Sequence, residues 1–228
     1  MRITGLIKTT LLDFPGKVAC TVFTYGCNFR CSFCHNARLV TEENPDIITE
    51  EEFFSFLSKR QGILDGVCIS GGEPTLQQDL PDFIRRIKEM GFAVKLDTNG
   101  YEPEILASLI NESLLDYVAM DIKSSPEGYS EICGTPIDIE RIRKSVSILK
   151  EGKVDYEFRT TCVKQYHTQD DFEKISQWLE GDSKYFLQHF EDSGYLIGDG
   201  LSAFSREETE NIAQNIGKRV PNIGLRGV

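Results

Sequence analysis

The feature that most constrains the fold is a regular alternation, along most of the chain, of short β-branched runs with amphipathic helical patterns. Apolar residues recur at helical spacing between these runs, as at Phe83, Ile84 and Ile87. Alternation of this kind implies a parallel sheet whose helical crossovers are right-handed. We expect strands at residues 18–25, 66–70, 92–97, 117–122, 154–163 and 185–190.

Polar residues mark where the intervening helices begin. Thr49 with Glu52, and Ser205 with Glu208, have capping-box spacing.

A complete eight-unit barrel takes about 250 residues, so about six units here predict an α/β fold, a partial (β/α)6 TIM-like barrel with parallel strands. No Ser-, Gly- or Pro-rich tract marks a linker, so we predict a single domain, 1–228, with an N-terminal lead-in at 1–17 and a flexible, locally basic tail at 217–228. Single residues expected to cap further helices are Asp79, Asp138 and Thr168.

The charge balance limits the classes of partner. The chain has 25 Lys and Arg against 36 Asp and Glu, a net charge of −11, which argues against nucleic-acid binding because phosphate contacts need a basic surface. No apolar run approaches the roughly 18 residues of a membrane span. Charged residues interrupt the N-terminal segment, which does not resemble a signal peptide. We expect a cytoplasmic protein with no nucleic-acid or membrane partner.

Three of the seven cysteines lie within eight residues, directly after the first predicted strand. Cys27, Cys31 and Cys34 have the spacing C-x3-C-x2-C, and soft thiolates select iron–sulfur clusters, zinc or cuprous copper. A closed zinc site needs a fourth ligand, and His35 adjoins Cys34, where joint chelation is awkward. The spacing favours a 4Fe–4S cluster with one open iron. Zinc and ordinary buried thiols are the alternatives.

Polar residues also follow the next strands, where the catalytic groups of parallel barrels lie. Gly-Gly-Glu-Pro at 71–74 is weak evidence alone, since such a sequence is usually a turn. Asp-Thr-Asn-Gly at 97–100 and Met-Asp-Ile-Lys at 120–123 follow the third and fourth strands. The structural alternative is that Asp97 and Asn99 form an Asx turn and that Lys123 is a solvated lysine. Arg159, inside an apolar strand beside Glu157, should face the barrel lumen because an unpaired buried charge is costly.

The cysteine spacing, with Phe33 just before the last cysteine, resembles the signature of the radical S-adenosylmethionine (SAM) enzymes. The resemblance implies that Cys27, Cys31 and Cys34 each bind one iron, while the amino and carboxylate groups of SAM chelate the fourth. It also implies that Glu73 and the adjacent backbone meet the methionine ammonium group. Residues expected to contact the cofactor are Phe33, Gly71, Gly72, Glu73, Asp97, Asn99, Asp121, Lys123, Arg159 and His189.

Two of these assignments have structural alternatives. Arg159 is a cofactor carboxylate or ribose contact by resemblance, and otherwise one half of an ion pair. His189 would lie near the adenosyl end, or else be a core histidine whose hydrogen bonds are satisfied.

The segments after the third and fourth strands resemble the activating enzymes of glycyl radical enzymes, including pyruvate formate-lyase activating enzyme. That resemblance implies a monovalent cation site beside the cofactor carboxylate. Its ligands would be Asp97, Thr98, Met120 and Asp121, through carboxylate and carbonyl oxygens.

The opening Gly-Leu-Ile-Lys-Thr-Thr-Leu-Leu-Asp-Phe-Pro-Gly-Lys at 5–17 and the cysteine loop resemble the anaerobic ribonucleoside-triphosphate reductase activating proteins. The resemblance implies that flavodoxin or ferredoxin reduces the cluster, SAM is cleaved, and the 5′-deoxyadenosyl radical takes a hydrogen atom from a glycine of that reductase. The alternatives are an activating enzyme for pyruvate formate-lyase or another glycyl radical enzyme, a peptide-modifying radical SAM enzyme, and a non-catalytic zinc or electron-transfer protein. A tRNA-modifying enzyme is disfavoured by the charge.

The remaining cysteines do not suggest a second cluster. Only 36 residues separate Cys34 from Gly71, with no cysteines for a ferredoxin-like insert except Cys68. Cys20, Cys68 and Cys162 fall on predicted strands as small apolar groups. Cys133 lies in a loop that we expect to be exposed, and the sequence assigns it no role.

Overall fold

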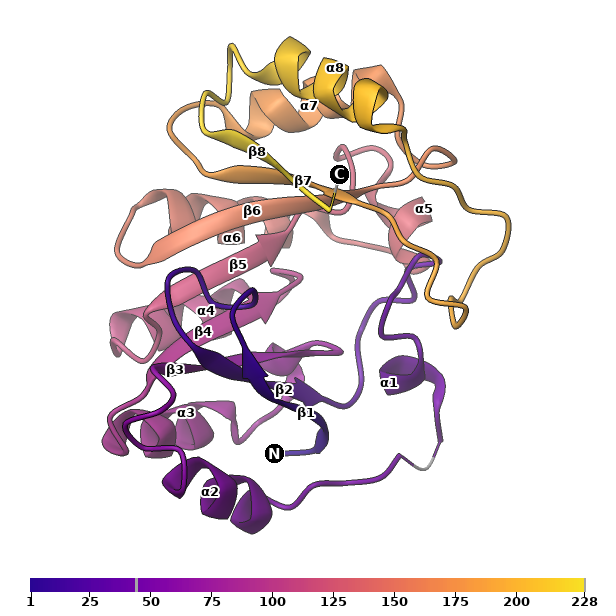
Figure 1. Cartoon of the computed structure of the whole chain (residues 1–228). Helices are drawn as coiled ribbons and strands as arrows, with labels where there is room; N and C mark the ends of the chain where they lie inside the picture. Colours follow the sequence, from indigo (N-terminus) through magenta and orange to yellow (C-terminus); the bar gives the residue numbers. More distant parts are fainter. Residues whose placement is uncertain (44, 228) are drawn as a thin grey trace.

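A computed structural model describes residues 1–43 and 45–227. Its centre is one eight-stranded sheet in which the strands follow one another in chain order (Figure 1). The strands are β1 (Ile3–Thr10), β2 (Ala19–Thr24), β3 (Gly66–Gly71), β4 (Ala93–Thr98), β5 (Tyr117–Asp121), β6 (Asp155–Cys162), β7 (Tyr185–His189) and β8 (Ile223–Arg226).

The sheet is an open, partial barrel. β1 runs antiparallel to β2, and every later pair is parallel. β1 and β8 are the two ends of the strand order, so the sheet does not close within the described part of the chain. The predicted parallel, partial barrel is confirmed, and its six predicted strands correspond to β2–β7.

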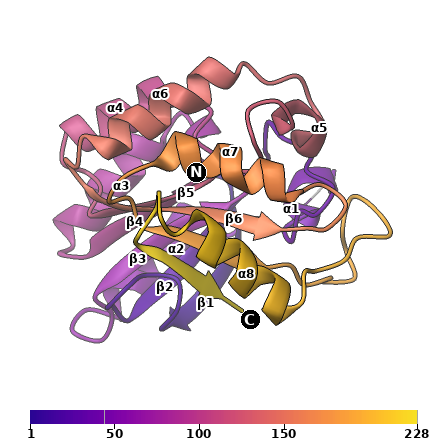
Figure 2. The same ribbon diagram turned by 90° about the horizontal axis from the view of Figure 1, so that it is seen from above.

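The short helices at residues 38–41 and 129–133 lie beside the carboxyl ends of the strands (Figure 1), and the six longer helices that the structure describes cover the convex, outer side of the curved sheet (Figure 2). Right-handed crossovers place them there, because each helix connects two neighbouring parallel strands. Thr49 with Glu52 and Ser205 with Glu208 form the expected capping boxes. The helices are α1 (Arg38–Thr41), α2 (Glu50–Ser58), α3 (Leu80–Glu89), α4 (Pro103–Asn111), α5 (Tyr129–Cys133), α6 (Ile139–Lys150), α7 (Gln169–Leu179) and α8 (Arg206–Ile216), with a short 3-10 turn η1 (Pro74–Leu76).

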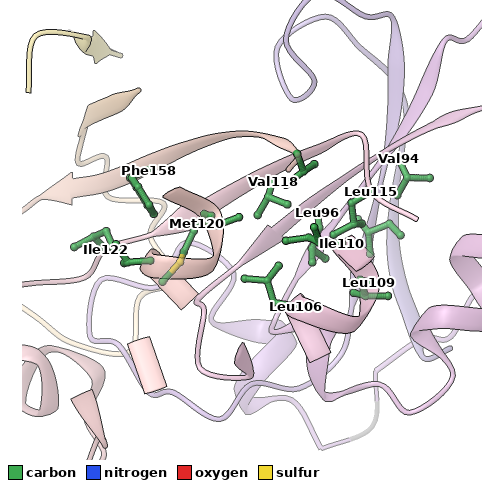
Figure 3. Close-up of a cluster of buried hydrophobic side chains, with 14 of the residues drawn as sticks. Val94, Leu96, Leu106, Leu109, Ile110, Leu115, Val118, Met120, Ile122 and Phe158 are labelled. Carbon is green, nitrogen blue, oxygen red and sulfur yellow. The ribbon is translucent and has the colours of Figure 1, made fainter. Parts of the chain in front are cut away.

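The main core lies between the sheet and these helices. Figure 3 shows one part of it, where apolar side chains of β4, β5 and α4 meet, among them Leu96, Leu106 and Met120. Alternate strand residues point into this layer, and the others point into the barrel lumen. The lumen is therefore the place where polar strand residues can gather.

Both ends of the chain differ from their predicted roles. The lead-in at 1–17 contains β1, and the tail at 217–228 contains β8. β8 is tied to the lumen by Arg226, whose guanidinium binds both carboxylate oxygens of Glu157 at 2.6 and 2.8 Å. Residues 223–226 are therefore an anchored edge strand.

No described helix is long and apolar enough to cross a membrane.

Candidate active site

A cavity of about 420 Å³ opens at the carboxyl ends of the parallel strands. Loops that follow β2, β3, β4 and β5 contribute to it, as do lumen residues of β6 and β7. The residues that line it are Asp13, Cys27, Phe29, Cys31, Phe33, Cys34, His35, Asn36, Val40, Ser70, Gly71, Gly72, Glu73, Asp97, Thr98, Asn99, Asp121, Lys123, Arg159, Thr161 and Gln188.

The three clustered cysteines lie on one loop that follows β2. All three line the cavity, although a free Cys side chain is most often found in an apolar core. The Phe29 amide donates to Cys27 Sγ at 3.3 Å, and the Cys34 amide donates to the Cys31 carbonyl at 3.1 Å. The chain thus brings three thiols to one cavity.

Cys133 is the cysteine for which the sequence prediction was wrong. It is fully buried, with 0% of its surface exposed, at the end of α5. Its carbonyl accepts the Arg30 amide at 2.7 Å, and its thiol contacts Cys31. The α5 helix therefore packs on the cysteine loop, which an exposed loop could not do.

The thiols differ in how easily they ionise. Burial raises the pKa of Cys27 to about 12, and it also raises the pKa of Cys34. The hydrogen bond from Cys133, aided by nearby Lys123, lowers the pKa of Cys31. Cys31 and Cys133 thus share one hydrogen-bonded environment beside Lys123.

The arrangement is unlike that of a mononuclear metal site. No three Cys, His, Asp or Glu side chains in the described part of the chain converge to hold a single ion. A 4Fe–4S cluster does not require such convergence, because each thiolate binds a different iron. The donor set fits the cluster better than it fits zinc.

Gly71 and Gly72 are required by close packing. A Cβ on Gly72 would lie 1.9 Å from the Gly26 carbonyl oxygen, and one on Gly71 would lie 2.2 Å from the Thr24 nitrogen. The Gly72 and Glu73 amides donate to Thr24 and Gly26 at 2.9 and 2.8 Å. The glycine pair thus fastens the β3 loop to the backbone leading into the cysteine loop.

Glu73 is buried and joins the ends of β3 and β4. Oε1 accepts from the Thr75 amide and hydroxyl and from Thr98 Oγ1, while Oε2 accepts from the Asn99 amide at 2.7 Å. Burial raises its pKa, although these hydrogen bonds oppose the shift. Oε2 accepts one described hydrogen bond, so it has capacity for another donor.

Paired charges extend from the strand ends into the lumen. Arg159 Nε donates to Asp121 at 2.9 Å, and its guanidinium lies 3.5 Å from Asp97. Lys123 binds the other oxygen of Asp121 at 2.9 Å, and Lys95 binds Asp97. Burial opposes ionisation of Asp121, but Arg159 and Lys123 outweigh it and hold its pKa below the usual range.

Two predicted site residues, both in the described part of the chain, do not line this cavity. The Met120 side chain is buried in the core and packs against Gly100 (Figure 3). His189 follows Gln188 on β7, and neighbouring strand residues point to opposite faces. Gln188 takes the lumen position, and His189 Nδ1 is buried without a partner among the described residues.

Several residues at or beside the cavity were not assigned to the site from the sequence. Asp13 and Gln188 line it, Lys95 pairs with Asp97, and Cys133 contacts Cys31. The alternation of Lys95 with Asp97 along one strand face was a usable signal. Nothing in the local sequence predicts that Asp13, from the turn after β1, reaches the cavity.

Comparison with known proteins decides the family. The family model described as the radical SAM superfamily matches residues 21–179. The chain belongs to the radical SAM superfamily. The cofactors of this superfamily are a 4Fe–4S cluster and SAM, as predicted. The expectation that the chain is an enzyme is confirmed as well.

Two relatives indicate the class of radical SAM enzyme to which the chain is similar. A Methanocaldococcus jannaschii protein, provisionally named a glycyl-radical enzyme activating enzyme, is 37% identical over 196 residues, 83% of this chain and 80% of that protein. The pyruvate formate-lyase-activating enzyme of Clostridium pasteurianum is 34% identical over 139 residues, 58% of this chain and 57% of its own length. This radical SAM enzyme is thus homologous to activating enzymes of glycyl radical enzymes.

A solved structure shares the fold. Streptococcus suis SuiB, crystallised with SAM, aligns with a TM-score of 0.67 at 17% identity, covering 89% of this chain and 48% of that one. At this identity the similarity supports the partial-barrel fold alone.

Proposed function

We propose that this radical SAM enzyme generates a glycyl radical on an anaerobic ribonucleoside-triphosphate reductase. The observation that carries the proposal is that three cysteines, the Gly-Gly-Glu segment and a set of paired charges line one cavity at the carboxyl ends of the strands. The relative at 37% identity supports the activating class. The resemblance of residues 5–17 supports the choice of the reductase.

Cys27, Cys31 and Cys34 would hold the 4Fe–4S cluster. When bound and reduced by flavodoxin or ferredoxin, the cluster supplies the electron that cleaves SAM to methionine and a 5′-deoxyadenosyl radical. Lys123, which lies 5.9 Å from the Phe33 ring centre, places a positive charge beside this loop. Buried Phe29 and Phe33 limit access of water to it.

The polar residues of the cavity would orient SAM. Glu73 Oε2 would accept from the methionine ammonium group, and Arg159 would bind the carboxylate or a ribose hydroxyl. Phe33, Asn99 and Lys123 would complete the contacts, whereas His189 would need to turn toward the lumen.

The proposal includes a monovalent cation at Asp97, Thr98, Asp121 and the Met120 carbonyl. Both carboxylates are already paired with Lys or Arg side chains. A cation would therefore have to share their oxygens.

The proposal is tested by anaerobic electron paramagnetic resonance. The reconstituted enzyme, reductant, SAM and the host's anaerobic reductase should give a glycyl-radical doublet on the reductase. The Cys31→Ala variant should give none. SAM cleavage without a doublet would reject this reductase as the partner while leaving the radical chemistry intact.

A second candidate partner is pyruvate formate-lyase, favoured by the Clostridium relative. The same reaction with pyruvate formate-lyase in place of the reductase separates the two. A doublet on the lyase alone would select the second candidate.

A further inference from the structure

The side chain of Asn99 is held in one orientation beside an expected iron ligand. Its Oδ1 accepts the Tyr101 amide at 2.9 Å, and its backbone amide donates to Glu73. Only 6% of Asn99 is exposed. Since the amide oxygen is occupied by Tyr101, the Nδ2 group must face the other way.

Nδ2 of Asn99 points toward the cysteine loop. It donates to Asn28 Oδ1 at 2.8 Å and lies 3.9 Å from Cys27 Sγ. Its two hydrogens therefore serve two acceptors, one amide oxygen and one sulfur. Turning the Asn28 amide over would bring two donors together, so Asn99 also fixes the orientation of Asn28.

The hydrogen bond between Asn99 and Asn28 leaves the side-chain amide nitrogen of Asn28 without an acceptor. Asn28 Nδ2 is buried and has no partner among the described residues. A buried donor without an acceptor costs about 1–3 kcal/mol. A donor left unpaired one residue from Cys27 fits a neighbour rich in acceptors, as the sulfurs of a cluster are.

Coordination by iron would change which groups can donate to Cys27 Sγ. As a thiol, Cys27 lies 3.7 Å from Asn28 Oδ1 and donates to it. As a thiolate ligand it has no proton to give and can only accept. Phe29 N–H and Asn99 Nδ2 are then the donors placed to meet its sulfur.

We propose that Asn99, oriented by Tyr101 and positioned by Asn28, donates a hydrogen bond to the Cys27 sulfur of the bound cluster and raises the reduction potential of that cluster. The inference rests on the proposed function, because it requires a cluster on Cys27, Cys31 and Cys34. The physical reason is that the reduced cluster carries one more negative charge, which a donor to sulfur stabilises. One electron from the external donor then reduces the cluster more readily.

The test is a potentiometric titration of the reconstituted enzyme without SAM, followed by electron paramagnetic resonance. Asn99→Ala removes the donor and keeps the backbone amide that binds Glu73. We expect its midpoint potential to fall by the equivalent of a tenfold change in the reduction equilibrium, about 59 mV for one electron. Water entering the vacated space would stabilise the reduced cluster and shift the potential upward, so the sign of the shift identifies the lost hydrogen bond.

Asn36→Ala is the matched control. Asn36 lines the same cavity, but its Nδ2 donates to the Gly71 carbonyl at 3.2 Å rather than to a sulfur. Its midpoint potential should equal that of the unaltered enzyme. Equal potentials for all three proteins would overturn the inference, as would a potential in Asn99→Ala that changes only after SAM is added.

A measurement on the unaltered enzyme covers the case in which Asn99→Ala does not hold iron. Asparagine labelled with 15N at the side-chain amide should give a nitrogen hyperfine coupling to the reduced cluster in electron–nuclear double resonance. Absence of that coupling would overturn the inference. Absence of any cluster in the unaltered enzyme would instead overturn the proposed function.

Discussion

At the scale of single residues, Gly72 shows how closely the loops of the site approach one another. Its φ is not in the left-handed region, so an alanine would be excluded only by the Gly26 carbonyl, 1.9 Å from the added Cβ. We predict that Gly72→Ala lowers the free energy of unfolding by about 3 kcal/mol, because backbone must move to relieve the overlap. Urea unfolding of the cluster-free protein measures this.

Gly152→Ala is the control for that substitution. Gly152 has a φ of +69° and nothing within 4 Å of an added Cβ, so only backbone strain of about 1 kcal/mol should appear. Equal losses in the two variants would mean that the contact with Gly26 is unimportant.

Cys133 tests whether the site has three cysteine ligands or four. It contacts Cys31, yet the proposed cluster needs an open iron for SAM. We predict that Cys133→Ala binds as much iron as the unaltered enzyme and still cleaves SAM, whereas Cys31→Ala loses both properties. Iron and sulfide analysis of anaerobically reconstituted protein decides, and loss of one iron per chain in Cys133→Ala would show a fourth ligand.

The Asp121 carboxylate makes a pH-dependent contribution to stability. Arg159 and Lys123 hold its folded pKa below the unfolded value of about 3.9. Its stabilisation is therefore complete above the unfolded pKa and is lost as the pH falls toward the folded pKa. We predict that Asp121→Asn costs about 2 kcal/mol at pH 7 and clearly less at pH 3, as measured by urea unfolding.

Asp82→Asn provides the comparison for the pH effect. Asp82 pairs with Arg85 on the surface, where an ion pair contributes under about 1 kcal/mol. A loss in Asp121→Asn that is the same at pH 3 and pH 7 would contradict the assigned charge pairing.

At the scale of elements, β8 pairs with β7 and is anchored by an ion pair between Arg226 and the buried Glu157 carboxylate. Glu157 is 1% exposed and also accepts from the Tyr117 hydroxyl at 2.9 Å. We predict that Arg226→Met lowers the free energy of unfolding by about 3 kcal/mol, because it leaves the buried carboxylate unpaired. Arg219→Met, which removes a more exposed pair with Glu173, should cost under about 1 kcal/mol in the same urea assay.

Adding Glu157→Gln to Arg226→Met removes the unpaired charge. The double variant should therefore recover part of the lost stability. A double variant less stable than Arg226→Met would show that the charge itself is not the cause.

Sequence patterns predicted the elements that are buried on both faces and missed those at the edges. β2–β7 lie between the lumen and the helices, so their residues form recognisable apolar runs. β1 has exposed residues at Ile7–Thr9, and β8 has only four residues, none of them fully buried. Edge strands such as these carry a weak periodic signal.

The residues of the site also differ in how well the sequence predicted them. The cysteine loop and Gly-Gly-Glu-Pro are contiguous in sequence, so their composition could be recognised directly. Asp13 and Gln188 lie far apart in the sequence and line one cavity only in the folded sheet. The family resemblance named His189, whereas the alternation of side chains along β7 gives the lumen position to Gln188.

At the scale of the whole molecule, the open sheet brings together one cavity, the proposed active site, from loops spread over most of the chain. Residues from Asp13 to Gln188 contribute to it, while the six longer described helices remain on the outer surface (Figure 2). In the proposed function, this cavity receives a glycine of the partner enzyme. The central claim is that the radical made in this cavity takes hydrogen from such a glycine.

Isotope transfer tests that claim most directly. The reconstituted enzyme, reductant and SAM are mixed anaerobically with the reductase, which has been expressed with glycine deuterated at both α-hydrogens. Mass spectrometry of the 5′-deoxyadenosine formed in one turnover should show one deuterium per molecule. Unlabelled 5′-deoxyadenosine, formed at the same rate with and without the reductase, would contradict the account.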